Sequence, residues 1–442
     1  MAAPWAASWF RADPLAHRAE DVLRIRGPGT HNLNLGVLCR QPDGRALRRI
    51  MLATTSTQEE TLHWLALRLV PGLGSRTTRQ LVDRFRTPQA IFRASRSELE
   101  AAGLSPGVAQ TISSGCTFED AVGQQEKMQE SATSLIALTD PRYPPKLREI
   151  FDPPVVLFAR GRIELLGSVM LGVVGTRRPT PYGTAVAERM SADLARAGLT
   201  IVSGMARGID TAAHKGALSA GGDSVAVFGC GVDVLYPTEN RKLAAELEQK
   251  GLIISEFPMG SPAYPQNFPI RNRIISGMGA GVLVVEGAQY SGSSITARLA
   301  LDQGRELFAV PGNVTSKMSW GPNLLIKQGA KLVQEWNDVV SELPREDRQR
   351  LIEAGRARLL GETGGDGSAT AGPQQASLPL GPSAVVGRKL LDLLQVDASA
   401  HIDTVMAKVE DCSSSEVIAA LFELEMLGLV RQLPGRNFVK VW

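Results

Sequence analysis

The sequence has little of what metal sites, disulfides and membrane spans require. Its four cysteines, Cys39, Cys116, Cys230 and Cys412, are scattered and show no Cys-x-x-Cys or other metal-ligand spacing. That usage is typical of a protein in the reducing cytosol. The longest apolar runs, such as residues 168–175, are far too short to cross a bilayer. We therefore expect a cytoplasmic protein with no metal, no cofactor and no membrane contact.

Length and composition indicate a soluble chain of two to four domains, because 442 residues exceed one ordinary core. The hydrophobic fraction is 43% and the charged fraction 21%, both ordinary for a globular protein. The net charge is only +3 and the pI is about 8.7. Any nucleic-acid site must therefore be a local basic patch.

Residues 1–56 are rich in arginine, proline and alanine and lack amphipathic periodicity. A transit peptide is one interpretation, but the acidic residues Asp13, Glu20, Asp21 and Asp43 argue against it. A disordered N-terminal extension, or translation from Met51, is the favoured alternative.

Residues 57–135 predict short helices over residues 59–69, 75–85, 97–102 and 108–113. The turn Val70-Pro71-Gly72-Leu73-Gly74, with Ser75 as the expected N-cap, has the composition of a helix-hairpin-helix. Such a glycine turn can present amides to a phosphate, although similar modules often serve only as scaffolds.

Residues 136–345 predict a mainly parallel sheet, with residues 136–166 as a proline-punctuated connector. Continuous Val, Ile and Leu runs alternate with helical segments, as strands covered on both faces require. The expected strands are residues 169–175, 200–204, 224–229, 252–257, 281–287, 306–312 and 330–335. Ligands of such sheets bind beyond the carboxyl ends of the strands.

Residues 346–382 predict a charged helical extension followed by a flexible linker from Gly361. Residues 383–442 predict three helices and a hairpin, the pattern of a winged helix. The third helix carries Glu416, Glu423 and Glu425 and has no Lys or Arg before Arg431. Acidic side chains repel the phosphates that line a duplex groove, so we expect a protein-contact module and a poor duplex reader.

The turns after the expected strands carry groups suited to phosphate: cations, amides freed by glycine, and hydroxyls at helix starts. No His, Cys or carboxylate cluster beside them is arranged to break a bond, so no catalytic residue is expected. We interpret His214 and Cys230 as packed side chains, and Asp210 as a helix N-cap. The candidate DNA-contacting residues in the turns after the first two strands are Gly175, Thr176, Arg177, Ser203, Gly204 and Arg207.

Two further segments complete the candidate site. In residues 267–275, helical spacing places Ile270 and Ile274 on one apolar face and turns Arg271 and Arg273 away from it. Phe268 could stack on an unpaired base or could staple the helix start, and Glu286 could orient Arg271 or Arg273. The candidate residues here are Asn267, Phe268, Arg271, Asn272, Arg273, Ser291, Gly292, Ser293, Ser294 and Thr296.

Over residues 57–442 the sequence resembles the DNA-processing protein A family, also called the Smf family. The resemblance rests on VGTRRPTPYG, IVSGMARGIDTAAHKGAL, FGCGVDVLYPTEN, NFPIRNRIISG, EGAQYSGSSITARLALDQGRELFAVPG and GPNLLIKQGAKLV, in family order. It implies an extended Rossmann-like domain between a sterile-alpha-motif-like helical domain and a winged helix. It also implies single-stranded DNA binding, protection of incoming strands in natural transformation and loading of RecA recombinase.

The resemblance assigns DNA contact to Arg177, Arg271 and Arg273, with support from Arg207, Arg241 and Lys242. Some members carry a lysine shortly before the FPxRN segment, where this chain has Tyr264-Pro265-Gln266-Asn267. The resemblance also implies a homodimer through the Rossmann-like domain, with Leu324, Leu325 and Ile326 at the contact.

Two enzyme classes compete with this interpretation. A cytokinin-activating phosphoribohydrolase needs a glutamate shortly after its glycine-rich turn, and SGSSITARLALDQ supplies none there. A dinucleotide oxidoreductase needs a GxGxxG turn and an acid after the second strand, and both are missing. We therefore expect non-catalytic, sequence-tolerant and salt-sensitive binding. Charge reversal of Arg271 and Arg273 is expected to abolish it without unfolding the protein.

Overall fold

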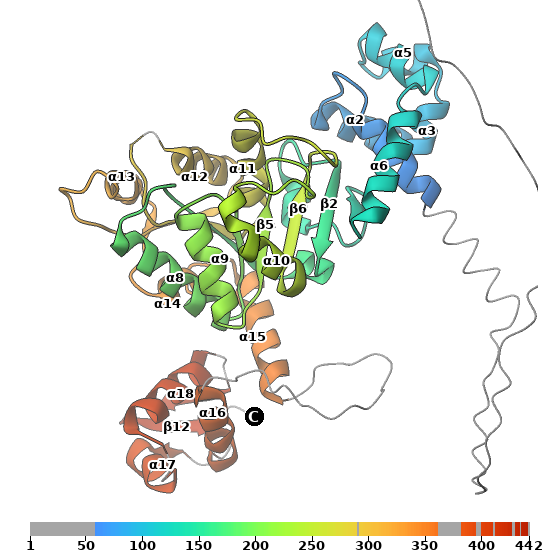
Figure 1. The fold of residues 1–442 in the computed structure, drawn as a ribbon. Coiled ribbons are helices and arrows are strands. Elements are labelled where there is room, and N and C mark those ends of the chain that lie inside the picture. Colours follow the sequence, from blue (N-terminus) through green and yellow to red (C-terminus); the bar gives the residue numbers. More distant parts are fainter. Residues whose placement is uncertain are drawn as a thin grey trace, which may run out of the picture. The chain divides into compact units, whose positions relative to one another are not determined.

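A nine-stranded sheet organises the central part of the chain (Figure 1). The computed structural model describes residues 58–289, 291–360, 382–394, 399–409, 412–426, 429–433 and 435–440. The predicted N-terminal extension and most of the predicted linker lie outside these residues.

The strand order is β1-β2-β6-β5-β4-β3-β7-β8-β9, and the strands from β6 to β9 run parallel. Chain order reverses between β3 and β7, which is where open α/β sheets bind ligands. The bounds are β1 Ser134–Ala137, β2 Val156–Gly161, β3 Met170–Val174, β4 Thr200–Ser203, β5 Ser224–Val227, β6 Leu252–Ser255, β7 Gly281–Val284, β8 Glu306–Ala309 and β9 Lys331–Leu332.

All seven predicted strands are present, but the interpretation of residues 136–166 as a mere connector is wrong. Strands β1 and β2 pair antiparallel with each other, and β2 pairs antiparallel with β6. The prolines of this segment lie between and beside the strands, where no ladder hydrogen bond is lost. The short helix α7 (Pro145–Glu149) starts on one of them.

Helices cover both faces of the sheet, which explains the continuous apolar runs. Core side chains of α8 and α9 pack with Leu171 and Ile201 on one face. Those of α11 and α12 pack with Val202 and Val282 on the other. The bounds are α8 Pro181–Arg196, α9 Ile209–Ser219, α10 Arg241–Lys250, α11 Asn267–Met278, α12 Gly292–Asp302, α13 Trp320–Lys327, α14 Trp336–Val340 and α15 Arg345–Leu360.

The N-terminal part of the described chain is helical. Residues 58–68 form a helix, followed by α2 (Ser75–Phe85), α3 (Pro88–Arg93), α4 (Arg96–Ala101), α5 (Pro106–Ser114) and α6 (Phe118–Glu130). Gln124 of α6 holds the segment after β6, since its amide accepts from Met259 N at 2.7 Å and donates to Met259 O at 3.3 Å.

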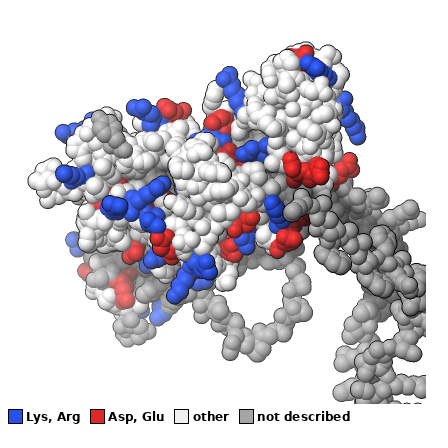
Figure 2. Space-filling view, turned by 45° about the horizontal axis from the view of Figure 1, so that its top comes forward, with Lys and Arg blue, Asp and Glu red and all other residues white. Residues whose placement is uncertain are grey.

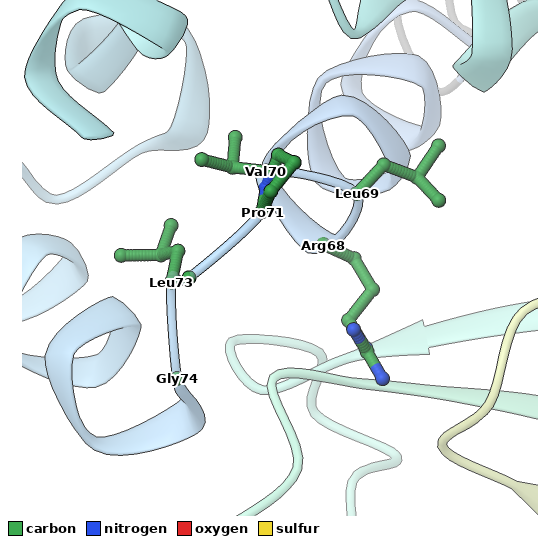
Figure 3. A pocket seen from close by; sticks show the side chains of 7 residues that line it. Arg68, Leu69, Val70, Pro71, Leu73 and Gly74 are labelled. Atoms are coloured by element: carbon green, nitrogen blue, oxygen red, sulfur yellow. The ribbon is translucent and has the colours of Figure 1, made fainter. Parts of the chain in front are cut away.

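The glycine turn between the first two helices differs from the prediction at its cap. Helix α2 starts at Ser75, its N-cap is Gly74, and no side chain caps it. A shallow depression of about 460 Å³, lined by residues 68–74, opens beside this turn (Figure 3). Arg68 at its edge donates from Nε to Glu256 O at 3.2 Å.

The C-terminal part is a winged helix with its own small core. It consists of α16 (Pro382–Leu393), β10 (Ala400–His401), α17 (Ile402–Lys408), α18 (Ser414–Met426), β11 (Val430–Leu433) and β12 (Asn437–Lys440). The three strands pair in the order β10-β12-β11. Ile418 and Phe422 of α18 are about half exposed, at 50% and 49%. None of the helices in the described ranges combines the length and apolar character of a membrane span.

Candidate nucleic-acid interface

The turns that follow β3, β4 and β7 are fastened to one another at one edge of the sheet. Thr176 N donates to Glu286 O at 2.7 Å, and Ile209 N donates to Thr176 O at 3.2 Å. The backbone therefore holds Arg177, the β4 turn and the β7 turn together before any side chain contributes. This is the edge that the strand pattern predicted.

Two glycines of the β4 turn are required by close approach and by backbone conformation. A Cβ on Gly204 would coincide with the guanidinium of Arg271. Gly208 has a φ of +80° and lies against the backbone at Thr176, so a side chain there would be both strained and blocked. These glycines let the β4 turn pack against α11 and the β3 turn.

Arg271 is almost completely buried at this edge, with 3% of its surface exposed. Its Nη2 donates to Gly204 O at 3.0 Å, and Asp210 is the carboxylate that attracts it. Burial lowers the pKa of Arg271 to about 10 against that attraction, so the guanidinium is charged at neutral pH. Burial also raises the pKa of Asp210, whose carboxylate accepts from Gly204 N at 3.1 Å and Ala206 N at 3.3 Å. The prediction of Asp210 as an N-cap is wrong, because Gly208 holds that position.

Phe268 is the aromatic centre of the edge. The guanidinium carbon of Arg177 lies 5.3 Å from its ring centroid and that of Arg271 lies 5.9 Å away. The Tyr236 ring lies at 5.4 Å from the Phe268 ring, tilted by 42°. Arg177 is exposed, Phe268 is half-buried, and Tyr236 is 42% exposed. We call Arg177, Tyr236, Phe268 and Arg271 the strand-end site.

Tyr236 is not among the residues that the sequence predicted for this site. It follows β5 in the segment FGCGVDVLYPTEN, a turn at the same sheet edge, and it is the aromatic residue of that turn beyond Phe228. An aromatic side chain at the carboxyl end of a parallel strand was the available signal.

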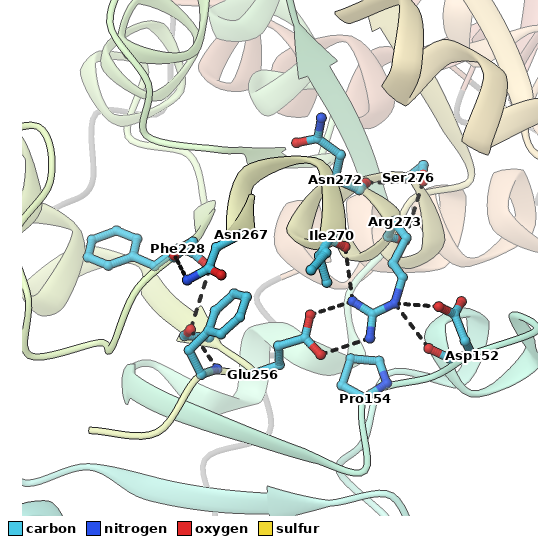
Figure 4. A network of polar contacts seen from close by, with 12 residues as sticks. Asp152, Pro154, Phe228, Glu256, Asn267, Ile270, Asn272, Arg273 and Ser276 are labelled. Carbon is cyan, nitrogen blue, oxygen red and sulfur yellow. Dashed lines mark hydrogen bonds and ion pairs between the residues drawn. The ribbon is translucent and has the colours of Figure 1, made fainter. Parts of the chain in front are cut away.

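The structure contradicts the predicted orientation of Arg273. Its Nη2 donates to Glu256 Oε2 at 2.8 Å, its Nη1 pairs with Glu256 Oε1, and its Nε lies 3.0 Å from Asp152 Oδ2 (Figure 4). Burial alone would lower the pKa of Arg273, but the hydrogen bonds and charge of Glu256 raise it. Arg273 is 7% exposed and joins three segments inside the protein.

The apolar face predicted for α11 is wrong for the same reason. Ile274 is fully buried, but Ile270 is 46% exposed and its carbonyl accepts from Arg273. The helix starts between two turns that each supply oxygen acceptors, so both arginines turn inward and Ile270 turns outward. Because both guanidiniums are buried, charge reversal of Arg271 and Arg273 should destabilise the fold, contrary to the expectation from the sequence.

Glu286 does not orient either arginine. Its carboxylate accepts from Thr180 N at 2.9 Å and from Thr180 Oγ1 at 2.6 Å. The Thr180 hydroxyl also accepts from Gly183 N at 3.1 Å as the cap of α8. Both carboxylate oxygens are hydrogen-bonded and only 2% of the residue is exposed, so Glu286 stabilises the turn after β3.

The hydroxyls of the β7 turn are partly internal. Ser291 Oγ lies 2.7 Å from Ser293 Oγ and 3.2 Å from Ser294 Oγ, and the Thr296 hydroxyl donates to Gly292 O at 3.4 Å. Ser293 and Thr296 are buried, whereas Gly292 is exposed and Ser291 and Ser294 are half-exposed. The accessible part of this turn is therefore its tip.

The other candidate residues divide into internal and exposed ones. Ser203 is buried and donates to Val173 O at 2.7 Å, and Asn267 is buried and donates to Gly229 O at 3.0 Å. Arg207 is exposed and paired with Glu239, while Arg241 and Lys242 are exposed at the start of α10. Gly175 and Thr176 are half-buried in the β3 turn, and Asn272 is half-buried on α11.

The interpretation of His214 and Cys230 as packed side chains is confirmed. His214 is fully buried, its Nδ1 lies 2.7 Å from Ser224 Oγ, and burial lowers its pKa to about 3. Cys230 is 1% exposed, and burial raises its pKa to about 12. Burial thus disfavours the charged form of both side chains. Among the described residues, no group of His, Cys, Asp or Glu could hold a metal ion.

Basic and acidic side chains are interspersed on the face that Figure 2 shows. On the face in view, Lys and Arg gather in several places with Asp and Glu between them. This agrees with a local basic site rather than a strongly charged molecule.

The fold and the site define a Rossmann-like α/β protein whose strand-end edge combines arginines with aromatic rings, followed by a winged helix. The family described as DNA recombination-mediator protein A matches residues 134–344, and the DprA winged helix domain matches residues 374–436. The chain belongs to the DNA processing protein A (DprA/Smf) family.

Two relatives and one solved structure document this membership. The chain is 42% identical over 221 residues to the DNA processing protein DprA of Bacillus subtilis, covering 50% of this chain and 74% of that protein. It is 33% identical over 393 residues to Protein Smf of Synechocystis sp., covering 86% and 98%. The X-ray structure of DNA processing protein A from Streptococcus pneumoniae superposes with a TM-score of 0.55 at 33% identity, covering 64% of this chain and 96% of that one.

Replacing either partner of the Arg273–Glu256 pair should lower the unfolding free energy of the protein substantially. Arg273→Ala would leave Glu256 buried without its partner, which costs about 3–5 kcal/mol of unfolding free energy. Urea denaturation followed by circular dichroism measures this loss. Arg96→Ala removes an exposed i,i+4 pair with Glu100 and serves as the control, with an expected change of about 0.5 kcal/mol or less. Equal losses for the two variants would contradict the structural role of Arg273.

Proposed function

We propose that this protein binds single-stranded DNA at the strand-end site, without catalysis, and that it protects incoming strands and loads RecA recombinase in natural transformation and homologous recombination. The observation that carries the proposal is the position of Arg177 and Arg271 around Phe268, with Tyr236 beside it. Cations attract the phosphates and rings receive the bases, which is the usual basis of sequence-tolerant single-strand binding.

The proposed contact set follows the exposure of the candidate residues. Arg177 and the rings of Phe268 and Tyr236 make the direct contacts, with Arg207, Arg241 and Lys242 attracting the strand from further along the edge. Arg271 is buried and contributes its charge from beneath Phe268. The half-buried Gly175, Thr176, Asn272, Ser291 and Ser294, with the exposed Gly292, border the site. Arg273, Asn267, Ser203, Ser293 and Thr296 support it from inside.

The state of the titratable groups supports binding without bond cleavage. Both oxygens of Glu286 accept hydrogen bonds from Thr180, and Asp210 accepts from two amides. A carboxylate engaged in this way is poorly placed to take a proton from a substrate. This argues against the phosphoribohydrolase alternative and supports binding without catalysis.

Arg177→Ala should weaken binding of an oligothymidylate about tenfold, because a phosphate contact at the exposed edge is lost. The dependence of log K on log salt should also become shallower by about 0.7, the contribution of one phosphate on a single strand. Fluorescence anisotropy at several salt concentrations measures both quantities.

Arg196→Ala is the matched control for this variant. Arg196 is exposed at the far end of α8, a helix of 16 residues and therefore about 24 Å long. Its removal should leave affinity and salt slope unchanged. The assignment of the strand-end site would be refuted by equal affinities of Arg177→Ala and the parent protein.

We further propose a homodimer that contacts through α13. Leu324, Leu325 and Ile326 are each half-buried in the single chain, and Leu325 also packs against the sheet core. Leu324→Glu with Ile326→Glu should convert a particle of about twice 47.4 kDa into a monomer without lowering its melting temperature much. Light scattering coupled to size-exclusion chromatography measures the molar mass of both proteins. Leu301→Glu on α12, whose parent side chain is 58% exposed, is the control that should remain dimeric.

Loading of RecA can be tested with the same preparation. The rate of RecA filament formation on single strands already coated by a single-strand-binding protein should rise when this protein is added, and Arg177→Ala should reduce the rise. No acceleration by the parent protein would contradict this part of the proposal.

A further inference from the structure

Phe151 is an exposed aromatic side chain outside the strand-end site. With 71% of its surface exposed, it has the largest exposed fraction among the exposed aromatic residues of the described chain. It lies between α7 and β2, and the guanidinium carbon of Arg76 sits 4.7 Å from its ring centroid. An arginine paired with an exposed ring is the combination that stacks on and neutralises a nucleotide.

The residues on either side of Phe151 are fixed, which holds the ring outside the core. Ile150 is 3% exposed, and its carbonyl accepts from Arg79 Nη1 at 3.1 Å. The Asp152 carbonyl accepts from Arg273 Nε at 3.1 Å, and the Asp152 carboxylate pairs with the same group at 3.0 Å. With both neighbours anchored, Phe151 is presented to solvent by a rigid backbone.

The same anchor connects Phe151 with the strand-end site. Arg273 follows Phe268 by five residues on α11, about 7.5 Å along the helix axis. Figure 4 shows Asp152 paired with the Arg273 guanidinium, whose Nη1 also donates to Ile270 O at 3.0 Å. Pro269 and Ile270 are exposed on the intervening turn. The segment that carries Phe151 is therefore anchored to the helix that carries Phe268, next to these exposed residues.

The charges around Phe151 favour a phosphate chain. The two carboxylates beside it are paired, Asp152 with Arg273 and Glu149 with Arg305 at 3.6 Å. On the other side, α2 has no acidic residue in its first turn and no side-chain cap on its N–H groups. The net contribution of Arg76 and Arg79 there is positive.

We propose that Phe151 and Arg76 form a second stacking contact for the DNA strand held at the strand-end site. This inference rests on the proposed function and extends it, because it makes the N-terminal helical region part of the DNA path. Only strands long enough to reach both contacts would gain affinity from Phe151. Binding at both contacts would be independent of the nucleotide sequence of the strand.

Phe151→Ala tests the inference with oligothymidylates of about 6 and about 20 nucleotides, lengths at the short end of and beyond typical site sizes. The variant should lose about fivefold or more in affinity for the longer strand and nothing for the shorter one. Phe151→Trp should retain the parent affinity. Phe422→Ala, which removes a half-exposed ring of the winged helix, is the control and should bind both lengths as the parent does.

The outcomes separate the second contact from the first. If Phe151→Ala binds the longer strand as the parent does, or loses no more than Phe422→Ala, the second contact is excluded while the strand-end site stands. Equal losses for both lengths also exclude it, because Phe151 would then act through the first site. If the parent binds neither strand, the proposed function and this inference both fail. Photo-crosslinking of a 5-bromouracil strand should give an adduct at Phe151. In Phe151→Ala no adduct should form at position 151.

Discussion

The candidate site depends on the burial of Arg271 beside Asp210 at the end of the parallel sheet. The guanidinium donates to the carbonyl of Gly204, and the carboxylate accepts from the amide of the same residue. Helix α11 and the β4 turn are thereby fixed to each other, and Phe268 is carried with the helix to the surface. Because a buried unpaired charge costs several kcal/mol, these groups must stay together, and the site is held rigid.

A second buried pair, Arg273 with Glu256, orients the same helix on its other side. Arg271 and Arg273 lie two residues apart and contact different segments. Arg271 reaches the β4 turn, and Arg273 reaches Glu256 directly after β6 and the segment before β2. Arg271 and Arg273 therefore hold α11, and Phe268 with it, in place, and both guanidiniums are buried. Arg177 supplies the exposed charge beside Phe268, whose ring lies near both the Arg177 and the Arg271 guanidinium.

The sheet could be predicted from sequence because Val, Ile and Leu runs buried on both faces leave a strong pattern. Strands β1 and β2 could not, since the prolines between and beside them resembled those of a connector. The edge of the sheet and its turns were also predictable, as the resemblance to DprA proteins and the strand ends agreed. The orientations of the Arg271, Arg273 and Glu286 side chains could not be predicted. Their partners Gly204, Glu256, Asp152 and Thr180 lie 17 to 121 residues away in sequence.

In the proposed complex, the unpaired strand lies at an edge of arginines and aromatic rings. Helix α18 of the winged helix exposes Ile418 and Phe422, where a duplex-binding helix would carry cations. The most direct measurement compares the binding of one sequence as a single strand and as a duplex across a salt titration. The account predicts that the single strand binds at least about tenfold more tightly at each salt concentration, since stacking needs unpaired bases. Equal or tighter binding of the duplex would contradict it.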